Sequence, residues 1–193
     1  GWVLGKVVPE VLGANITYVV RARFVLLRDL GSALSPTNAF NFIQGLETLP
    51  IRYKKHQENA EKVADFLTGK KNVNRVIHPK YSLGLNKERA KKYLEDGNGP
   101  LVGFELDGGI EAGKTFIDSL ELIYHVANIG DARTLAIHPA STTHSQLGTE
   151  DQLRAGVTPG YIRLSVGIEH IDDIINDIDQ AINKAQDKVK NVA

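Results

Sequence analysis

Hydrophobic side chains in the first third of the chain recur every three or four residues, the spacing of one face of an α-helix. The first such stripe consists of Ile16, Val19, Val20, Phe24 and Leu27. It predicts a helix over residues 15–30 that ends at Gly31, because glycine readily adopts the left-handed conformation of a helix C-terminus. Ser35 and Pro36 form a typical helix start, with a capping hydroxyl and a proline in the first turn. A further helix is predicted after Pro50.

Short apolar runs alternate with helical segments in the rest of the chain. The predicted strands are 75–78, 101–107, 122–127, 134–138 and 161–170, and the predicted helices are 86–94, 110–120, a short one around Leu153 and a terminal one from 171. This order is typical of a layered α/β domain. We expect a small, largely antiparallel sheet with helices on one side, formed by residues 35–193 and preceded by a helical connector in residues 1–34.

The charge balance and composition exclude several classes of function. Lysine plus arginine and aspartate plus glutamate both number 23, so the net charge is zero. Nucleic-acid and anionic membrane partners are therefore not expected, since both favour a basic excess. Cysteine is absent, which excludes disulfides, thiol nucleophiles and thiolate zinc sites. No apolar run approaches the length of a membrane span, so a soluble, cytoplasmic protein is expected. Methionine is also absent, as in a processed chain or a piece of a longer one.

Several other patterns are rejected as sites. His138 and His144 do not have the spacing of a zinc helix, and no carboxylate completes a set, so no metal is expected. The glycines of residues 107–114 match neither the phosphate-loop nor the dinucleotide motif, and a serine nucleophile would need a G-x-S-x-G elbow that the sequence lacks. The acidic run of residues 171–179 is interpreted as the solvated face of the terminal helix.

The segment YIRLSVGIEH (161–170) places an arginine inside a predicted strand. Strand side chains alternate between two faces. The apolar face, which suits the helix layer, carries Ile162, Leu164, Val166 and Ile168, and the other face carries Tyr161, Arg163 and Ser165. The Arg163 guanidinium offers a planar fork of donors that matches a carboxylate or phosphate. The alternative to anion binding is that Arg163 forms a structural salt bridge or lies on a solvated face of the sheet. The pattern by itself favours this alternative.

The loop HPASTTHSQL (138–147) offers hydroxyl and backbone donors for an anion. Its hydroxyl side chains are Ser141, Thr142, Thr143 and Ser145. Such loops suit recognition of anions or zwitterions, although the same hydroxyls can instead cap the loop locally. The sequence leaves open whether this loop and Arg163 meet.

Three long segments resemble one enzyme family, the pyridoxal-phosphate (PLP)-dependent enzymes of cysteine and methionine metabolism. They are RDLGSALSPTNAFNFIQGLETLPIRYKKHQENAEKVADFL (28–67), GDARTLAIHPASTTHSQL (130–147) and GVTPGYIRLSVGIEHIDDIINDIDQAI (156–182). They occur in the family's order, and the resemblance covers about residues 14–185. Within the family, the sequences of these segments are most similar to those of the O-acetylhomoserine sulfhydrylases.

The resemblance implies the C-terminal domain of a fold-type I PLP enzyme, with residues 1–34 as the connector from a missing N-terminal PLP domain. The family's cofactor lysine lies in an S-x-T-K setting, and no lysine of this sequence has that setting. Cofactor-binding and catalytic residues are therefore expected outside this piece, which by itself should bind no PLP and be inactive. The resemblance implies a homotetramer for the full-length enzyme. Residues 1–13 have no assigned role.

The resemblance also implies the substrate site. Arg163 matches the arginine that binds the α-carboxylate of the amino-acid substrate, Ser141 matches a position beside that carboxylate, and Thr142 adjoins it. The implied reaction is a transferase reaction that forms homocysteine from O-acetylhomoserine and sulfide. The alternatives are a cystathionine or methionine γ-lyase or synthase of the same family, and a stand-alone amino-acid-binding module.

Overall fold

A computed structural model describes residues 16–192 and divides the chain after Thr48 into two compact units. Each unit is described by itself. The predicted boundary after residue 34 falls within the first unit, and the assignment of residues 1–34 as a connector stays a prediction. Asn15, where the first helix was predicted to begin, and residues 1–13 lie outside the described residues.

The first unit consists of helices, and the predicted end of the first at Gly31 and the predicted start of the second at Ser35 and Pro36 are confirmed. α2 (Thr17–Arg21), the π-helical η1 (Ala22–Leu27) and α3 (Arg28–Leu30) follow one another without a break in helical backbone. Gly31 ends this run with a φ of 67°, in the left-handed region. The next helix is α4 (Pro36–Glu47). The Ser35 hydroxyl accepts a hydrogen bond from the Asn38 N–H at 3.2 Å, which is the predicted cap.

The second unit contains a five-stranded sheet. Its strands are β1 (Val73–Ile77), β2 (Leu101–Leu106), β3 (Tyr124–His125), β4 (Leu135–Ile137) and β5 (Tyr161–Ser165). They lie in the order β1-β2-β5-β4-β3, and all neighbours are antiparallel except β3 and β4. This confirms the predicted fold class, a largely antiparallel sheet.

The last strand is shorter than predicted, and side chains of α5 (Leu49–Thr68) bind the carbonyl groups beyond its end. His56 Nδ1–H donates to the Val166 carbonyl at 2.6 Å, and the Asn59 amide donates to the Gly167 carbonyl at 3.0 Å. The regular ladder of β5 ends at Ser165, and beyond it the Val166 and Ile168 N–H groups donate to the carbonyls of Pro100 and Ala132, both at 2.9 Å. The predicted strand over 122–127 is likewise reduced to the two residues of β3.

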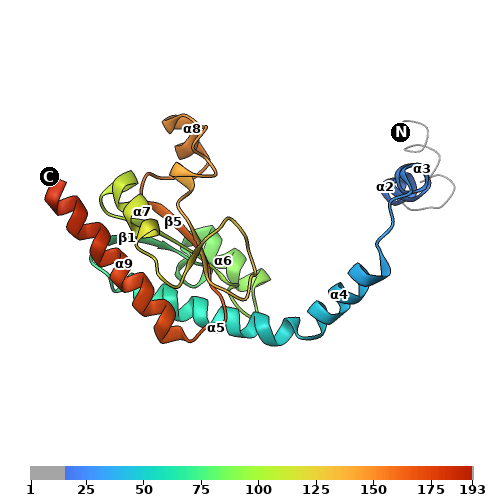
Figure 1. Cartoon of the computed structure of the whole chain (residues 1–193), viewed down its shortest axis with the longest axis horizontal. Coiled ribbons are helices and arrows are strands. Elements are labelled where there is room, and N and C mark those ends of the chain that lie inside the picture. The colour runs from blue at the N-terminus through green and yellow to red at the C-terminus, as the bar shows by residue number, and fades with distance from the viewer. Residues whose placement is uncertain (1–15, 193) are drawn as a thin grey trace. The chain divides into compact units, whose positions relative to one another are not determined.

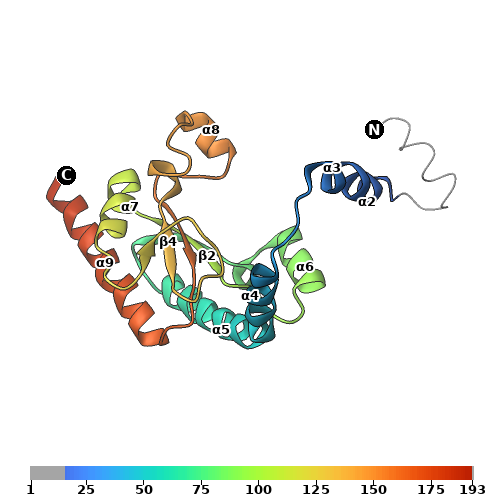
Figure 2. The same ribbon diagram turned by 45° about the vertical axis from the view of Figure 1, so that its right-hand side comes forward.

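Helices cover one face of the sheet, as predicted. The α-helices of the second unit are α5 (Leu49–Thr68), α6 (Gly84–Tyr93), α7 (Gly109–Asp118), α8 (Thr149–Arg154) and α9 (Ile171–Val192), and the short 3-10 helices are η2 (Pro79–Tyr81) and η3 (Pro139–Ser141). α5 and α7 pack against the strands, and α9 packs against both of these helices (Figures 1 and 2). No helix within residues 16–192 combines the length and the apolar character needed to cross a membrane.

The core lies between the sheet and α5, α7 and α9. Its strand side chains are Val102, Phe104, Leu106, Ile162 and Leu164, all at most 2 % exposed. Phe104 meets Phe116 of α7 edge to face, with ring centroids 5.4 Å apart. The alternation predicted for β5 is therefore correct, and it leaves Arg163 on the face of the sheet opposite this core.

The interpretation of residues 171–179 as a solvated helix face is wrong for Asp177, whereas Asp172 and Asp173 are exposed. Asp177 belongs to the acidic run assigned to a solvated helix face, yet its side chain is buried, with 6 % exposure. Its carboxylate accepts the backbone N–H groups of the segment between α7 and β3, which no helix or strand satisfies. These donors are the N–H groups of Glu121, Leu122 and Ile123, at 2.9, 3.0 and 2.9 Å.

Candidate functional site

Arg163 lies at the centre of the sheet, on the face that the helices leave uncovered. In the register of the sheet it stands opposite Gly103 of β2 on one side and Ile137 of β4 on the other. Tyr161, two residues earlier on β5, shares its face and stands opposite Glu105. The strand pattern thus places the guanidinium on a rigid central strand.

The Arg163 side chain lacks an acidic partner among residues 16–192. Its Nη2 donates to the Asn128 main-chain carbonyl at 3.3 Å. Its Nε is buried and makes no hydrogen bond within the described residues. The structural salt bridge considered as an alternative is therefore not formed in this part of the chain. A half-buried cation with unused donors is suited to bind an external anion.

A cavity of about 320 Å³ opens beside the guanidinium. Its walls include Arg163, Tyr161 and Gly103 from the sheet, together with Ile77 and Pro79 from the end of β1 and from η2. This volume lies at the lower end of the range of roughly 300–1,000 Å³ that is usual for small-molecule sites. The site is therefore large enough for a small amino acid.

Gly103 makes room for the aromatic wall of this cavity. A Cβ atom at Gly103 would lie 2.8 Å from Cε2 and from Oη of Tyr161, so the tyrosine ring covers the backbone at this position. Burial raises the pKa of the Tyr161 phenol, an effect that the charge of Arg163 partly opposes. The wall next to Arg163 is therefore a neutral phenol at pH 7. A glycine within a strand is the only sequence signal that could have indicated this close approach.

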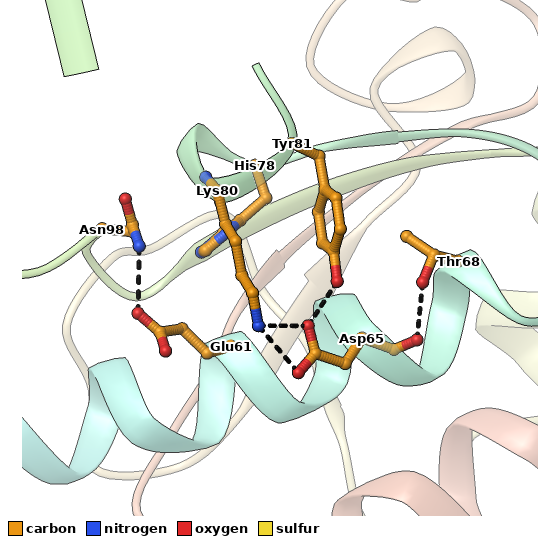
Figure 3. Close-up of polar contacts among 7 residues, drawn as sticks. All are labelled: Glu61, Asp65, Thr68, His78, Lys80, Tyr81 and Asn98. Carbon is orange, nitrogen blue, oxygen red and sulfur yellow. Dashed lines mark hydrogen bonds and ion pairs between the residues drawn. The ribbon is translucent and has the colours of Figure 1, made fainter. Parts of the chain in front are cut away.

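The opposite wall, η2, is attached to α5 by polar side chains. Asp65 of α5 accepts hydrogen bonds from Lys80 Nζ at 2.6 and 2.9 Å and from the Tyr81 hydroxyl (Figure 3). Asn98 donates to Glu61 of the same helix at 3.0 Å. The Asp65 contacts fix η2, and with it the edge of the cavity, on the helix layer, and the Asn98 contact holds the segment between α6 and β2 on the same helix.

The Asp65 contacts predict an acid-dependent loss of stability. The hydrogen bond from Lys80, followed by that from Tyr81, lowers the pKa of Asp65 from its usual 3.8. A lowered folded-state pKa contributes stability that is complete above pH 3.8 and is lost as the pH falls through the folded-state value. We expect Asp65→Asn to be less stable than the parent chain at pH 7, and this difference to shrink below about pH 4. Denaturant titrations of both proteins at pH 7 and at pH 3 give the difference in their free energies of unfolding.

Asp118→Asn is the matched control for this prediction, because Asp118 is exposed at the end of α7. Its difference from the parent chain should be small at both pH values. A stability difference for Asp65→Asn that stays constant between pH 7 and pH 3 would contradict the assignment.

The loop 138–147 forms its own network next to β5. His138 is buried, with 1 % exposure, and burial lowers its pKa, so it is neutral. Its Nε2 lies 2.7 Å from the Pro159 carbonyl, which can only accept, so Nε2 carries the proton. Nδ1 then accepts the hydrogen bond from the Ser141 hydroxyl at 2.8 Å. Gly113 of α7 leaves space for this ring, since a Cβ there would clash with it.

The structure brings this loop and β5 into contact, which the sequence left open. η3, which contains Ser141, packs against β5. The Thr142 hydroxyl donates to the His138 carbonyl at 2.9 Å. Within the described residues, Ser141 and Thr142 lie outside the lining of the Arg163 cavity. Their hydroxyls thus serve the loop itself, and their role beside a carboxylate stays a prediction.

The lysine side chains bear on whether this part of the chain could hold PLP. Every lysine in residues 16–192 is exposed or only half-buried, whereas a cofactor lysine needs an enclosing pocket. Four of them form ion pairs with acidic side chains, namely Lys70, Lys80, Lys114 and Lys184. Across residues 16–192, no three His, Asp or Glu side chains gather in a way that could hold a metal ion.

Comparisons with known proteins place this arrangement in a family. The sequence model described as "Cys/Met metabolism PLP-dependent enzyme" matches residues 5–183. The O-acetyl-L-homoserine sulfhydrylase of Leptospira meyeri is 54 % identical over 171 residues, which are 88 % of this chain and 39 % of that protein. The L-methionine gamma-lyase of Fusobacterium nucleatum subsp. polymorphum is 40 % identical over 181 residues, which are 93 % of this chain and 46 % of that protein.

A solved structure shows the same fold. An enzyme from Campylobacter jejuni assigned as O-acetylhomoserine (thiol)-lyase, which carries N'-pyridoxyl-lysine-5'-monophosphate, superposes with a TM-score of 0.79 and 42 % identity. The match covers 87 % of this chain and 40 % of that one. The chain thus spans about two fifths of the length of these relatives. Because the family model matches residues 5–183, and because both the sequence and the fold agree with its members, the chain belongs to the Cys/Met metabolism PLP-dependent enzyme family.

Proposed function

We propose that the chain is the C-terminal, substrate-carboxylate-binding part of a PLP-dependent enzyme that makes homocysteine from O-acetylhomoserine and sulfide. The observation that carries this proposal is the Arg163 guanidinium, which faces a cavity and lacks an acidic partner within residues 16–192. The similarity to the Leptospira meyeri sulfhydrylase supports the choice of reaction.

The role of Arg163 follows from its geometry. An α-carboxylate in the cavity would receive two parallel N–H donors from the guanidinium, which fixes the direction of the substrate as well as its position. A central strand holds the arginine in place, so little entropy is lost when the substrate binds. Ser141 and Thr142 are proposed to border the same carboxylate. Since their hydroxyls are bound within the loop, they would act through the loop's main-chain groups.

The chemistry of bond breaking is assigned to another part of the enzyme. PLP, when bound, supplies an electron sink for proton removal beside the carboxylate. The described lysines do not offer a site for it, so we propose that this piece alone is inactive and that its partner is an N-terminal PLP domain connected through residues 1–34. A cytoplasmic homotetramer is the proposed state of the full-length enzyme.

A γ-lyase is the second candidate, because the Fusobacterium methionine gamma-lyase is 40 % identical to this chain. Arg163 would hold the carboxylate in the same way in both reactions. The lower identity than to the sulfhydrylase, 54 %, makes it the less favoured of the two. A stand-alone amino-acid-binding module would use the same arginine without any reaction.

The reaction itself provides the test. The full-length enzyme, purified with PLP, is incubated with O-acetylhomoserine and sulfide, and separately with methionine. We expect homocysteine from the first mixture at a rate at least about tenfold above the release of 2-oxobutyrate from methionine. Faster release of 2-oxobutyrate would favour the γ-lyase. Binding of an amino acid by the 193-residue chain without PLP, together with inactivity of the full-length protein, would favour the binding module.

A further inference from the structure

The guanidinium of Arg163 is directed by a loop. Its Nη2 donates to the main-chain carbonyl of Asn128 at 3.3 Å. Asn128 belongs to residues 126–130, which follow β3, and all five of these residues are exposed. A carbonyl on an exposed segment can orient a side chain only if other contacts hold that segment in place.

Ser165 supplies such a contact from the same strand as the arginine. Its hydroxyl oxygen accepts the N–H of Gly130 at 3.1 Å, two residues after Asn128 in the loop. Gly130 has a φ of 83°, so the chain turns sharply there in the left-handed region. The Asn128 side chain also accepts the N–H of Ile129, at 2.9 Å. The two N–H groups that follow the Asn128 carbonyl in the chain are thereby both bound, one within the loop and one by β5.

The position of Ser165 is itself rigid. It is 1 % exposed, and it pairs with Leu101 of β2 and Leu135 of β4, one on each side. Arg163 and Ser165 lie two residues apart on one face of the strand, roughly 7 Å along it. A single strand therefore carries both the arginine and the group that anchors the arginine's acceptor.

Thr134, four residues after this loop, is attached to the residues that follow β5. Glu169 accepts the N–H of Thr134 at 2.6 Å and its hydroxyl at 2.8 Å. The Gly167 N–H donates to the Thr134 hydroxyl oxygen at 2.9 Å. Between this attachment and β3, the Ile168 N–H donates to the Ala132 carbonyl at 2.9 Å, and Arg163 and Ser165 are the side chains of β5 that hydrogen-bond to residues 126–130.

We propose that Ser165 is a positioning residue for substrate binding: it holds the loop whose Asn128 carbonyl orients the Arg163 guanidinium. The proposal rests on the proposed function, since it assumes that Arg163 binds the substrate carboxylate. Without the Ser165 hydroxyl, the Asn128 carbonyl would no longer be held in one position, and the Arg163 guanidinium would lose its fixed orientation. The proton transfers and the binding of sulfide do not depend on this hydroxyl. A neutral hydrogen bond of this kind corresponds to about a fivefold change in affinity.

The test is a kinetic comparison in the full-length enzyme. Ser165→Ala should raise KM for O-acetylhomoserine about fivefold and leave kcat and KM for sulfide unchanged. Ser165→Thr, which keeps the hydroxyl, should restore KM towards the parent value. Thr115→Val is the matched control, because Thr115 is also a buried hydroxyl, on α7, and lies outside the cavity lining. It should leave all three constants unchanged.

A double-mutant comparison separates positioning from a general structural role. In an Arg163→Lys background, Ser165→Ala should change KM by less than about twofold, because a lysine has no planar fork to orient. An equal effect of Ser165→Ala in both backgrounds would overturn the proposal, as would parallel changes in kcat and in KM for sulfide. If Ser165→Ala does not fold, Ser165→Cys keeps the size and weakens the acceptor, and the same predictions apply.

The two proposals fail in different ways. If Arg163→Lys leaves KM for O-acetylhomoserine unchanged, the carboxylate role of Arg163 is wrong and the positioning role falls with it. If Arg163→Lys raises KM but neither Ser165→Ala nor Ser165→Cys does, only the positioning role is wrong.

Discussion

Replacement of Arg163 by lysine in the full-length enzyme is expected to lower kcat/KM for O-acetylhomoserine by roughly 30- to 1,000-fold. This corresponds to a loss of about 2 to 4 kcal/mol in binding and orientation of the substrate. Lysine keeps the charge but presents it on a compact ammonium group, so the two parallel hydrogen bonds to a carboxylate cannot form. Steady-state kinetics with O-acetylhomoserine as the varied substrate measure the effect.

A second arginine provides the control for this substitution. Arg154 lies on α8 with 79 % of its side chain exposed, and among residues 16–192 its acidic partner is Asp151, one turn away. Arg154→Lys should leave kcat/KM within about twofold, since surface ion pairs contribute little. An unchanged kcat/KM for Arg163→Lys would remove the carboxylate assignment, whatever reaction the enzyme carries out.

Replacement of Asp177 by alanine is expected to have the largest effect on stability, a loss of about 3 kcal/mol. Its carboxylate accepts three consecutive backbone N–H groups of the segment between α7 and β3, and a further hydrogen bond from Gln180 at 2.9 Å. Alanine would leave these donors without their acceptor, and the Ile123 N–H lies at a buried position. The free energy of unfolding of the 193-residue chain, from denaturant titration, tests this expectation.

Asp187 is the matched control on the same helix. It is exposed on α9, so Asp187→Ala should change the free energy of unfolding by less than about 0.5 kcal/mol. Equal stabilities of the Asp177 and Asp187 variants would show that water replaces the carboxylate without cost, and would contradict the structural role of Asp177.

Several elements could be predicted from the sequence because local interactions determine them. Gly31 ends its helix through backbone conformation, and Ser35 caps the next one through a hydrogen bond three residues away. The alternation in β5 puts Ile162 in the core and Arg163 on the opposite face. Each depends on residues at most a few positions apart, so the sequence contains the whole interaction.

The partners of side chains could not be predicted, because they come from distant parts of the chain. The acidic run of α9 has the pattern of a solvated face, but the chain before β3 brings unpaired N–H groups to Asp177, which buries it. The spacing of His138 and His144 bears only on metal binding, whereas packing against Gly113 and Pro159 makes His138 a neutral bridge between the loop and the turn before β5.

The sequence by itself determined the helix ends, the strand alternation and, through three long segments, the family. Only the tertiary structure decided that Arg163 faces a cavity without an acidic partner in the described residues, with an Asn128 carbonyl directing it. The physical reason is that the pairing of a guanidinium charge depends on every charged and polar group that folding brings within a few ångströms of it. That set is fixed by the packing of β5 against its neighbours, and no local pattern records it.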